Sequence, residues 1–88
     1  MYNYQVEKAA IFTEKGQREF LKIRDQVYHL LTVAGAVRAQ EATAGVCGDS
    51  WTHLACVDRL VELGEIRELT GPNCCWQYRV FVKARDGK

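Results

Sequence analysis

Apolar residues recur at intervals of three and four between Phe20 and Leu31, which is the spacing of one face of an α-helix. Thr13 precedes this stretch and carries the short hydroxyl side chain that favours a helix N-cap. The pattern stops near Gly35, a residue that adopts the left-handed conformation of a helix C-cap without steric cost. The sequence therefore predicts a long helix between these two caps.

Two further helices are expected in the middle of the chain. The stretch 37–45 has room for a brief extended piece followed by a compact helix around residues 40–44. Asp49 or Ser50 supplies the N-cap of the next helix, and Gly64 terminates it. On a helical wheel at about 100° per residue, one side of this helix is expected to be packed and the other exposed. The expected packed side carries His53, Leu54, Val57, Leu60 and Val61, and the expected exposed side carries Trp51, Thr52, Ala55, Asp58, Arg59 and Glu62.

The C-terminal part of the chain predicts two strands joined by a turn. Residues 65–70 and 75–85 are rich in β-branched and aromatic side chains, and Pro72 with Asn73 favours a turn between them. In the second strand, alternation predicts an apolar inner face and a basic outer face. The inner face would carry Trp76, Tyr78, Val80 and Val82, and the outer face Gln77, Arg79, Phe81, Lys83 and Arg85.

The first twelve residues have a different period. Tyr2, Tyr4 and Val6 alternate with polar residues, which predicts a short strand or an extended arm laid along a surface. A frayed terminus is the alternative for this segment.

Composition places the chain among small folded proteins. Of its 88 residues, 48% are hydrophobic and 26% are charged, a balance that is unlike that of a disordered chain. The formal net charge is +1, whereas a dedicated nucleic-acid binder usually has a larger basic excess. The chain has neither the roughly 20-residue apolar run that crosses a bilayer nor a secretion signal at its start. We therefore expect a cytoplasmic protein whose four cysteines are reduced thiols.

One stretch resembles a known family. The segment THLACVDRLVELGEIREL, residues 52–69, is similar to the part of MarR-type bacterial regulators that runs from the recognition helix into the wing. The matching positions are Val57, Asp58, Arg59, Leu60, Glu62, Gly64 and Ile66. The order of the expected elements is also that of a winged helix-turn-helix domain. The resemblance implies an α+β fold with three helices and a C-terminal β-hairpin wing over residues 13–88, preceded by an N-terminal arm of residues 1–12.

The likeness implies a small DNA-binding protein that regulates transcription and binds as a dimer. In such proteins the recognition helix enters the major groove and the wing touches the backbone or the minor groove. The residues that would face the groove are Ser50, Trp51, Thr52, Ala55 and Arg59. The wing contacts would come from Asn73, Arg79 and Arg67, and the phosphate contacts from Arg18, Lys22, Arg79 and Lys83.

The same surface also fits a protein partner. Arg59 offers the paired donors that read base edges, but Asp49, Asp58 and Glu62 place negative charge where phosphates would lie. A winged helix reused as a protein-binding module or inhibitor, of the kind that phages and mobile elements encode, would bind no DNA. Its partner-binding residues would be Trp51, Leu54, Tyr2 and Tyr4. The sequence supports both alternatives.

Catalysis and metal binding have weak signals. His53 and Cys56 lie three positions apart, and Cys47 with the Cys74–Cys75 pair would be needed to complete a zinc site, but these spacings match no compact zinc motif. The chain carries no nucleophile elbow and no glycine-rich phosphate loop. We therefore expect no enzyme activity, no metal site and no cofactor.

Overall fold

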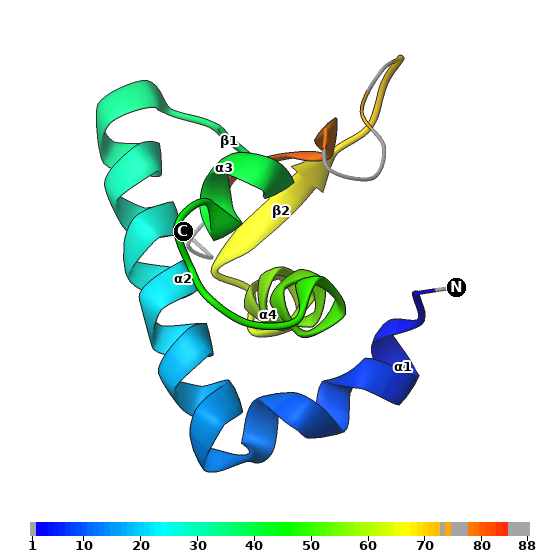
Figure 1. Ribbon diagram of the computed structural model, residues 1–88. Coiled ribbons are helices and arrows are strands. Elements are labelled where there is room, and N and C mark those ends of the chain that lie inside the picture. The colour runs from blue at the N-terminus through cyan, green and yellow to red at the C-terminus, as the bar shows by residue number, and fades with distance from the viewer. Residues whose placement is uncertain (1, 73, 75–77, 85–88) are drawn as a thin grey trace.

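The computed structural model describes residues 2–72, 74 and 78–84, and it has an α+β fold (Figure 1). In chain order the elements are helix α1 (Tyr4–Glu7), the 3-10 helix η1 (Lys8–Phe12), α2 (Glu14–Ala34), strand β1 (Val37–Arg38), α3 (Ala39–Thr43), α4 (Ser50–Glu62), β2 (Ile66–Leu69) and β3 (Val80–Lys83). The three strands form an antiparallel sheet in the order β1-β3-β2. This arrangement confirms the α+β class that the sequence predicts.

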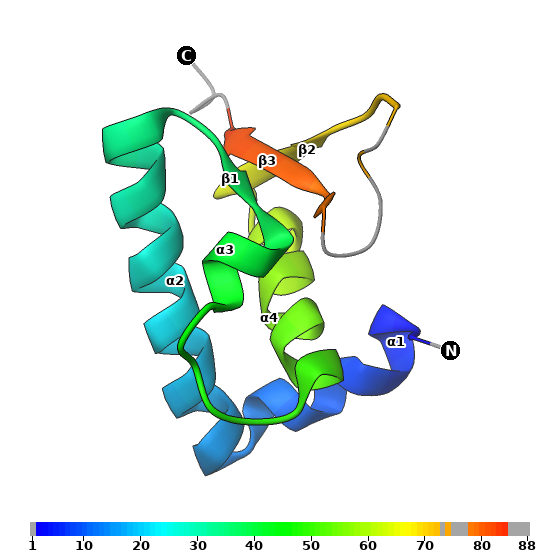
Figure 2. The ribbon, with the colours of Figure 1, turned by 45° about the horizontal axis from the view of Figure 1, so that its top comes forward.

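Helix α2 begins and ends at the predicted caps. The Thr13 hydroxyl oxygen accepts a hydrogen bond from the Gly16 amide at 3.0 Å, and Gly35 closes the helix with a φ of 80°. The apolar stripe from Phe20 to Val27 is buried and packs against α4, which runs beside α2 in Figure 2. The predicted caps and periodicity of this helix are therefore confirmed.

Helices α3 and α4 also lie where the sequence predicts them. Asp49 occupies the N-cap position of α4, although its side chain makes no capping hydrogen bond. Beyond the other end, Gly64 turns the chain toward β2 with a φ of 81°. The buried side of α4 carries His53, Cys56, Val57 and Leu60. This side forms much of the core between α2 and the sheet.

The two faces of β3 differ from the prediction. Phe81 is expected on the outer face, but its side chain is 0% exposed and its backbone is paired with Val37 on one side and Glu68 on the other. Val80 and Val82 are only half-buried. Side chains on both faces of β3 are therefore buried to some degree. A period of two does not show which of two such faces is the inner one.

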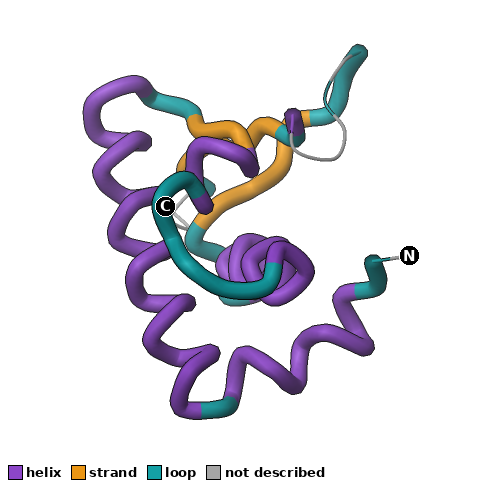
Figure 3. The backbone as a smooth tube through the Cα atoms, in the orientation of Figure 1, coloured by secondary structure: helices purple, strands orange, loops and turns teal. Residues whose placement is uncertain are grey.

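Residues 4–12 form helical turns, so the predicted strand or extended arm is wrong. The side-chain oxygen of Asn3 caps α1 by accepting a hydrogen bond from the Gln5 amide at 2.9 Å. The segment continues as η1, turns at Thr13 into α2 and runs past one side of α4 (Figure 3). Ile11 is 1% exposed and belongs to the core. Contacts with α4, not pairing with another strand, determine the backbone of this segment.

A substitution at Gly16 tests how closely η1 packs against α2. A Cβ added to Gly16 would lie 1.9 Å from the Ala10 carbonyl oxygen and 2.8 Å from the Cα of Ile11. We expect Gly16→Ala to lower the free energy of unfolding by about 1–3 kcal/mol, the usual effect of overpacking. In an open helix the same substitution stabilises by up to about 1 kcal/mol, so the sign of the change is informative. Thermal unfolding followed by circular dichroism measures it.

The matched control is Gly71→Ala, because a Cβ added there meets no atom within 4 Å. Its unfolding temperature should stay close to that of the wild type. A Gly16→Ala protein as stable as the wild type would contradict the close approach of η1 to α2.

Candidate interaction surface

Helix α4 is covered on more than its core side. It contacts α2 and α3, and also α1 and η1 from the N-terminal segment. Ala55 is 0% exposed, so the prediction that Ala55 faces outward toward a DNA groove is wrong. The helical wheel did not account for the N-terminal segment, which packs against the side of α4 that the periodicity predicts to be exposed.

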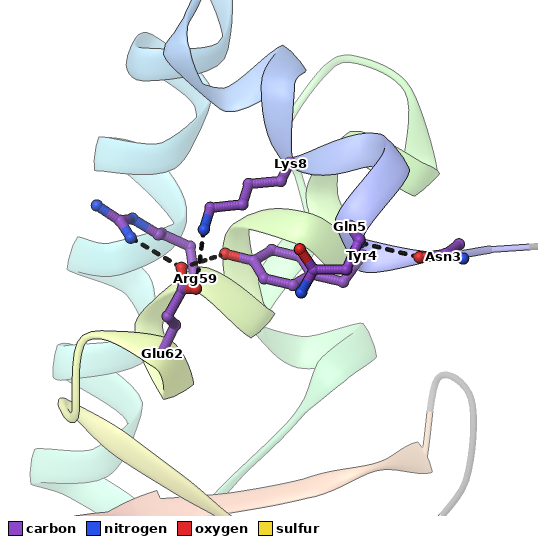
Figure 4. Close-up of polar contacts among 6 residues, drawn as sticks. All are labelled: Asn3, Tyr4, Gln5, Lys8, Arg59 and Glu62. Atoms are coloured by element: carbon purple, nitrogen blue, oxygen red, sulfur yellow. Dashed lines mark hydrogen bonds and ion pairs between the residues drawn. The ribbon is translucent and has the colours of Figure 1, made fainter.

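Three polar contacts join the N-terminal segment to this outer side of α4. The Tyr2 hydroxyl donates to Asp58 Oδ2 at 2.6 Å, and the Tyr4 hydroxyl donates to Glu62 Oε1 at 2.7 Å. Lys8 Nζ donates to the other oxygen of Glu62 at 2.8 Å. Figure 4 shows the donors converging on the Glu62 carboxylate. The tyrosines that the sequence groups with a protein-binding surface therefore bind within their own chain.

Arg59, the expected base-reading residue, is also held in place. Its Nη1 donates to Glu62 Oε1 at 2.8 Å, and its guanidinium lies 5.2 Å from the centroid of the Phe12 ring. The Arg59 side chain is 25% exposed. To contact a base edge, this guanidinium would have to leave both its carboxylate and the aromatic ring.

Arg79 is engaged by two carboxylates. It donates to Glu68 through Nε at 3.0 Å and through Nη2 at 2.8 Å, and its Nη2 also donates to Asp58 at 2.7 Å. Its side chain is 18% exposed, and the hydrogen bonds to Glu68 are the largest cause of its raised pKa. Arg79, which directly precedes β3, thus links β2 to α4, and its charge is compensated internally instead of being presented to a phosphate.

The contacts of the N-terminal segment shift the pKa values of the groups involved. Hydrogen bonds from Lys8, Tyr4 and Arg59 lower the pKa of Glu62 to about 2. Burial and the hydrogen bond to Glu62 raise the pKa of Tyr4 to about 12, and burial and Asp58 raise that of Tyr2. The contribution of the Glu62 carboxylate to stability is therefore fully present above its ordinary pKa of 4.5. The contribution of the Tyr4 phenol is fully present below the ordinary tyrosine pKa of 10.0.

The first turn of α4 remains open. Ser50 is exposed, Thr52 is half-buried, and Trp51 is 40% exposed. A groove of about 330 Å³ lies between this turn, α3 and the N-terminal segment, and it is lined by Tyr2, Ala39, Gln40, Thr43, Ser50, Trp51, His53 and Leu54. The structure therefore brings together three of the four predicted partner-binding residues: Tyr2, Trp51 and Leu54. Tyr4 lies apart from them at Glu62.

Basic side chains gather next to the start of α4. Lys15, Arg18 and Lys22 lie on one side of α2 and border a depression of about 210 Å³ together with Glu19, Val46 and Cys47. All three basic side chains are exposed. We call Lys15, Arg18 and Lys22 the basic stripe. The sequence singled out Arg18 and Lys22, and the spacing of three and four residues along α2 places Lys15 beside them.

The other predicted phosphate contacts are not part of this stripe. Lys83 pairs with Ile66, just beyond the C-terminal end of α4. Because α4 has 13 residues, its two ends are about 20 Å apart, and Figure 2 shows β3 at the opposite end of the molecule from the start of α4. Asn73, the predicted contact at the tip of the wing, lies outside the described residues.

A buried polar contact supports the loop that precedes α4. His53 Nε2 lies 3.3 Å from Glu19 Oε1 and 3.2 Å from the Cys47 carbonyl oxygen. The loop passes so close that a Cβ on Gly48 would lie 2.6 Å from both Glu19 carboxylate oxygens. Sequence reasoning missed Glu19, although a carboxylate beside the apolar stripe of α2 signals a buried polar contact. This contact places the loop between the basic stripe and the first turn of α4.

Comparisons with protein-family models, with curated proteins and with solved structures find no match to this chain. Among the described helices, none is both long enough and apolar enough to cross a bilayer. Within the described part of the chain, no three histidine, cysteine or acidic side chains group in a way that would hold a metal ion. The geometry of α4 and its surroundings is therefore the basis for a functional proposal.

The raised pKa of Tyr4 leads to a test in alkaline solution. Because the folded state favours the neutral phenol, the contribution of this contact to stability is complete below pH 10.0 and is lost as the pH rises toward about 12. An ultraviolet titration of tyrosinate should show a late ionisation step near pH 12 in the wild type. Tyr4→Phe should lower the amplitude of the late ionisation by one tyrosine. A Tyr4→Phe titration with the same late amplitude would contradict the Tyr4–Glu62 contact.

Proposed function

We propose that this chain is a winged-helix domain that binds double-stranded DNA at the end of the molecule where α4 begins. The observation that carries the proposal is the chain order α2-β1-α3-α4-β2-β3 together with the sheet order β1-β3-β2. A helix, a short strand, two helices and an antiparallel hairpin constitute the winged helix-turn-helix plan, in which the last of the three helices reads DNA. On this plan α4 is the recognition helix, and β2 with β3 supports the wing.

The charge distribution supports contact with DNA phosphates at this end. The basic stripe presents Lys15, Arg18 and Lys22 on consecutive turns of α2, beside the loop that leads into α4. The amides in the first turn of α4 add the positive end of a 13-residue helix. Asp49 is an exposed carboxylate at the same place and reduces this attraction. Three basic side chains and a helix N-terminus are sufficient for weak, sequence-independent binding.

Base readout by the middle of α4 is not available in this arrangement. The Arg59 guanidinium is paired with Glu62 and stacked on Phe12, and Arg79 is paired with Asp58 and Glu68. The proposed binding therefore depends chiefly on phosphates, with the first turn of α4 nearest to the bases. Dimeric binding and a role in transcription stay predictions, because no contact among the described residues tests them.

Fluorescence anisotropy of a labelled random duplex tests the proposal. Three phosphate contacts imply that raising the salt concentration fourfold weakens binding by about 40-fold. Arg18→Gln combined with Lys22→Gln should lower the slope of log affinity against log salt concentration by about 2, because each contact contributes about 0.9. The matched control is Arg24→Gln combined with Lys83→Gln, which removes the same charge from outside the basic stripe, since Arg24 lies beside Asp25 and Lys83 lies on β3. The control should leave the slope close to that of the wild type.

Two outcomes would count against this assignment. Equal slopes for the two double variants would show that the basic stripe is not the contact surface. Absence of binding by the wild type at low salt would reject the DNA proposal itself.

The Trp51 groove favours a second candidate function, which is docking on a protein. A tryptophan at the rim of a groove with a mainly uncharged lining is typical of the aromatic anchors at protein interfaces. The pairing of Arg59 and Arg79 with carboxylates also reduces the number of cations available to DNA. Under this alternative the winged helix is an interaction module or inhibitor that presents its groove to a partner.

A pair of aromatic substitutions tests the second candidate. Trp51→Ala should weaken binding to a protein partner by about 30-fold, the effect of losing an anchor worth about 2 kcal/mol. Tyr78→Ala is the matched control, because Tyr78 is 48% exposed on the path into β3 and does not line the groove. The measurement is quantitative crosslinking of each variant in cell extract, with the captured protein identified and its affinity then measured. A partner that both variants bind equally well would place the interface elsewhere.

A further inference from the structure

We propose that residues 2–8 form a releasable cover, and that its release sets how deeply α4 enters the DNA major groove. We call this segment the α1 cover. The inference rests on the proposed function and adds a form of regulation to it. The cover occupies the outer side of the expected recognition helix, and it is less deeply buried than the segment that follows it.

The α1 cover is held at the surface, with no fully buried side chain. No residue of α1 is buried, and Val6 is 68% exposed. Its polar attachments are the hydrogen bonds of Tyr2 to Asp58 and of Tyr4 and Lys8 to Glu62, and the rings of Tyr2 and Tyr4 pack against the core while staying only partly buried. A segment with so little buried surface opens locally at far less free energy than global unfolding requires.

The following segment, η1, is anchored in the core. Ile11 is 1% exposed, and Gln17 Nε2 donates to its carbonyl oxygen at 2.7 Å. The Thr13 hydroxyl donates to the Ala10 carbonyl oxygen at 2.8 Å, and Gly16 packs directly on the same carbonyl group. Opening is therefore confined to the residues before η1 is anchored, and the hinge lies between Lys8 and Ile11.

The dimensions of the major groove give the cover its effect. The groove is about 12 Å wide and admits one helix, whose diameter with side chains is about 10–12 Å. A second helical segment packed alongside adds an axis separation of about 8–10 Å, so the pair is about 20 Å across. With the cover in place, α4 can present its first turn, but its outer side around Asp58 and Glu62 cannot enter the groove.

Release leaves the outer side of α4 electrically balanced. When the cover departs, Asp58 keeps its contact with Arg79, and Glu62 keeps its contact with Arg59. The number of phosphate contacts from the basic stripe does not change. Release should therefore tighten binding through closer approach to the bases, without making binding more sensitive to salt.

The experiment opens the cover without changing charge. Tyr2→Phe combined with Tyr4→Phe removes both hydroxyl donors and keeps both rings. Tyr28→Phe is the matched control, because the Tyr28 hydroxyl donates to Glu65 at 2.7 Å away from the cover. The first readout is the rate of trypsin cleavage after Lys8, measured by mass spectrometry against cleavage after Lys15 in the same sample. Such cleavage reports the population of the open form.

We expect the double variant to be cleaved after Lys8 at least tenfold faster than the wild type. Its affinity for duplex DNA should be at least tenfold higher, with an unchanged salt slope, and the control should match the wild type in both readouts. Unchanged cleavage would overturn the hinge. Faster cleavage with unchanged DNA affinity in a wild type that binds DNA would overturn the inference alone. Absence of DNA binding by both proteins would overturn the proposed function together with the inference.

Discussion

Two carboxylates on the outer side of α4 hold together parts of the chain that are far apart in sequence. Asp58 accepts hydrogen bonds from Tyr2 and Arg79, and Glu62 accepts them from the N-terminal segment and from its own helix. A partly buried carboxylate is costly unless several donors compensate its charge. The N-terminal segment, α4 and the start of β3 therefore constrain one another's positions through these two side chains.

This network decides which surfaces of the protein are open to a partner. It engages Arg59 and Arg79, the two arginines nearest the middle of α4, and leaves exposed the first turn of that helix with Trp51. The groove beside Trp51 and the basic stripe on α2 both adjoin this turn. A DNA backbone and a protein partner would thus approach the same end of the molecule, and they differ in which of the two neighbouring surfaces they use.

The N-terminal segment combines two levels of stability within eleven residues. Its second half belongs to the hydrophobic core through Ile11, whereas its first half has no fully buried residue and is attached by polar contacts and by the partly buried rings of Tyr2 and Tyr4. Segments that move in regulation come from the least stable parts of a fold, because only these parts open without unfolding the rest. The less stable first half lies over the expected recognition helix, so its opening would change the surface that this helix presents.

Local signals in the chain were sufficient for the helices from α2 to α4 and for the existence of two C-terminal strands. The caps at Thr13 and Gly35 and the stripe between them depend only on residues within a few positions of each other, so they can be read in order along the chain. The same signals did not reveal that Phe81 faces inward or that the first residues are helical, because both depend on what lies across the fold. The decisive partners are distant, since the Tyr2–Asp58 contact spans 56 positions and the Arg79–Asp58 contact spans 21. Periodicity carries no information at such separations, and only the tertiary structure shows that the helix expected to read DNA is covered by the start of its own chain.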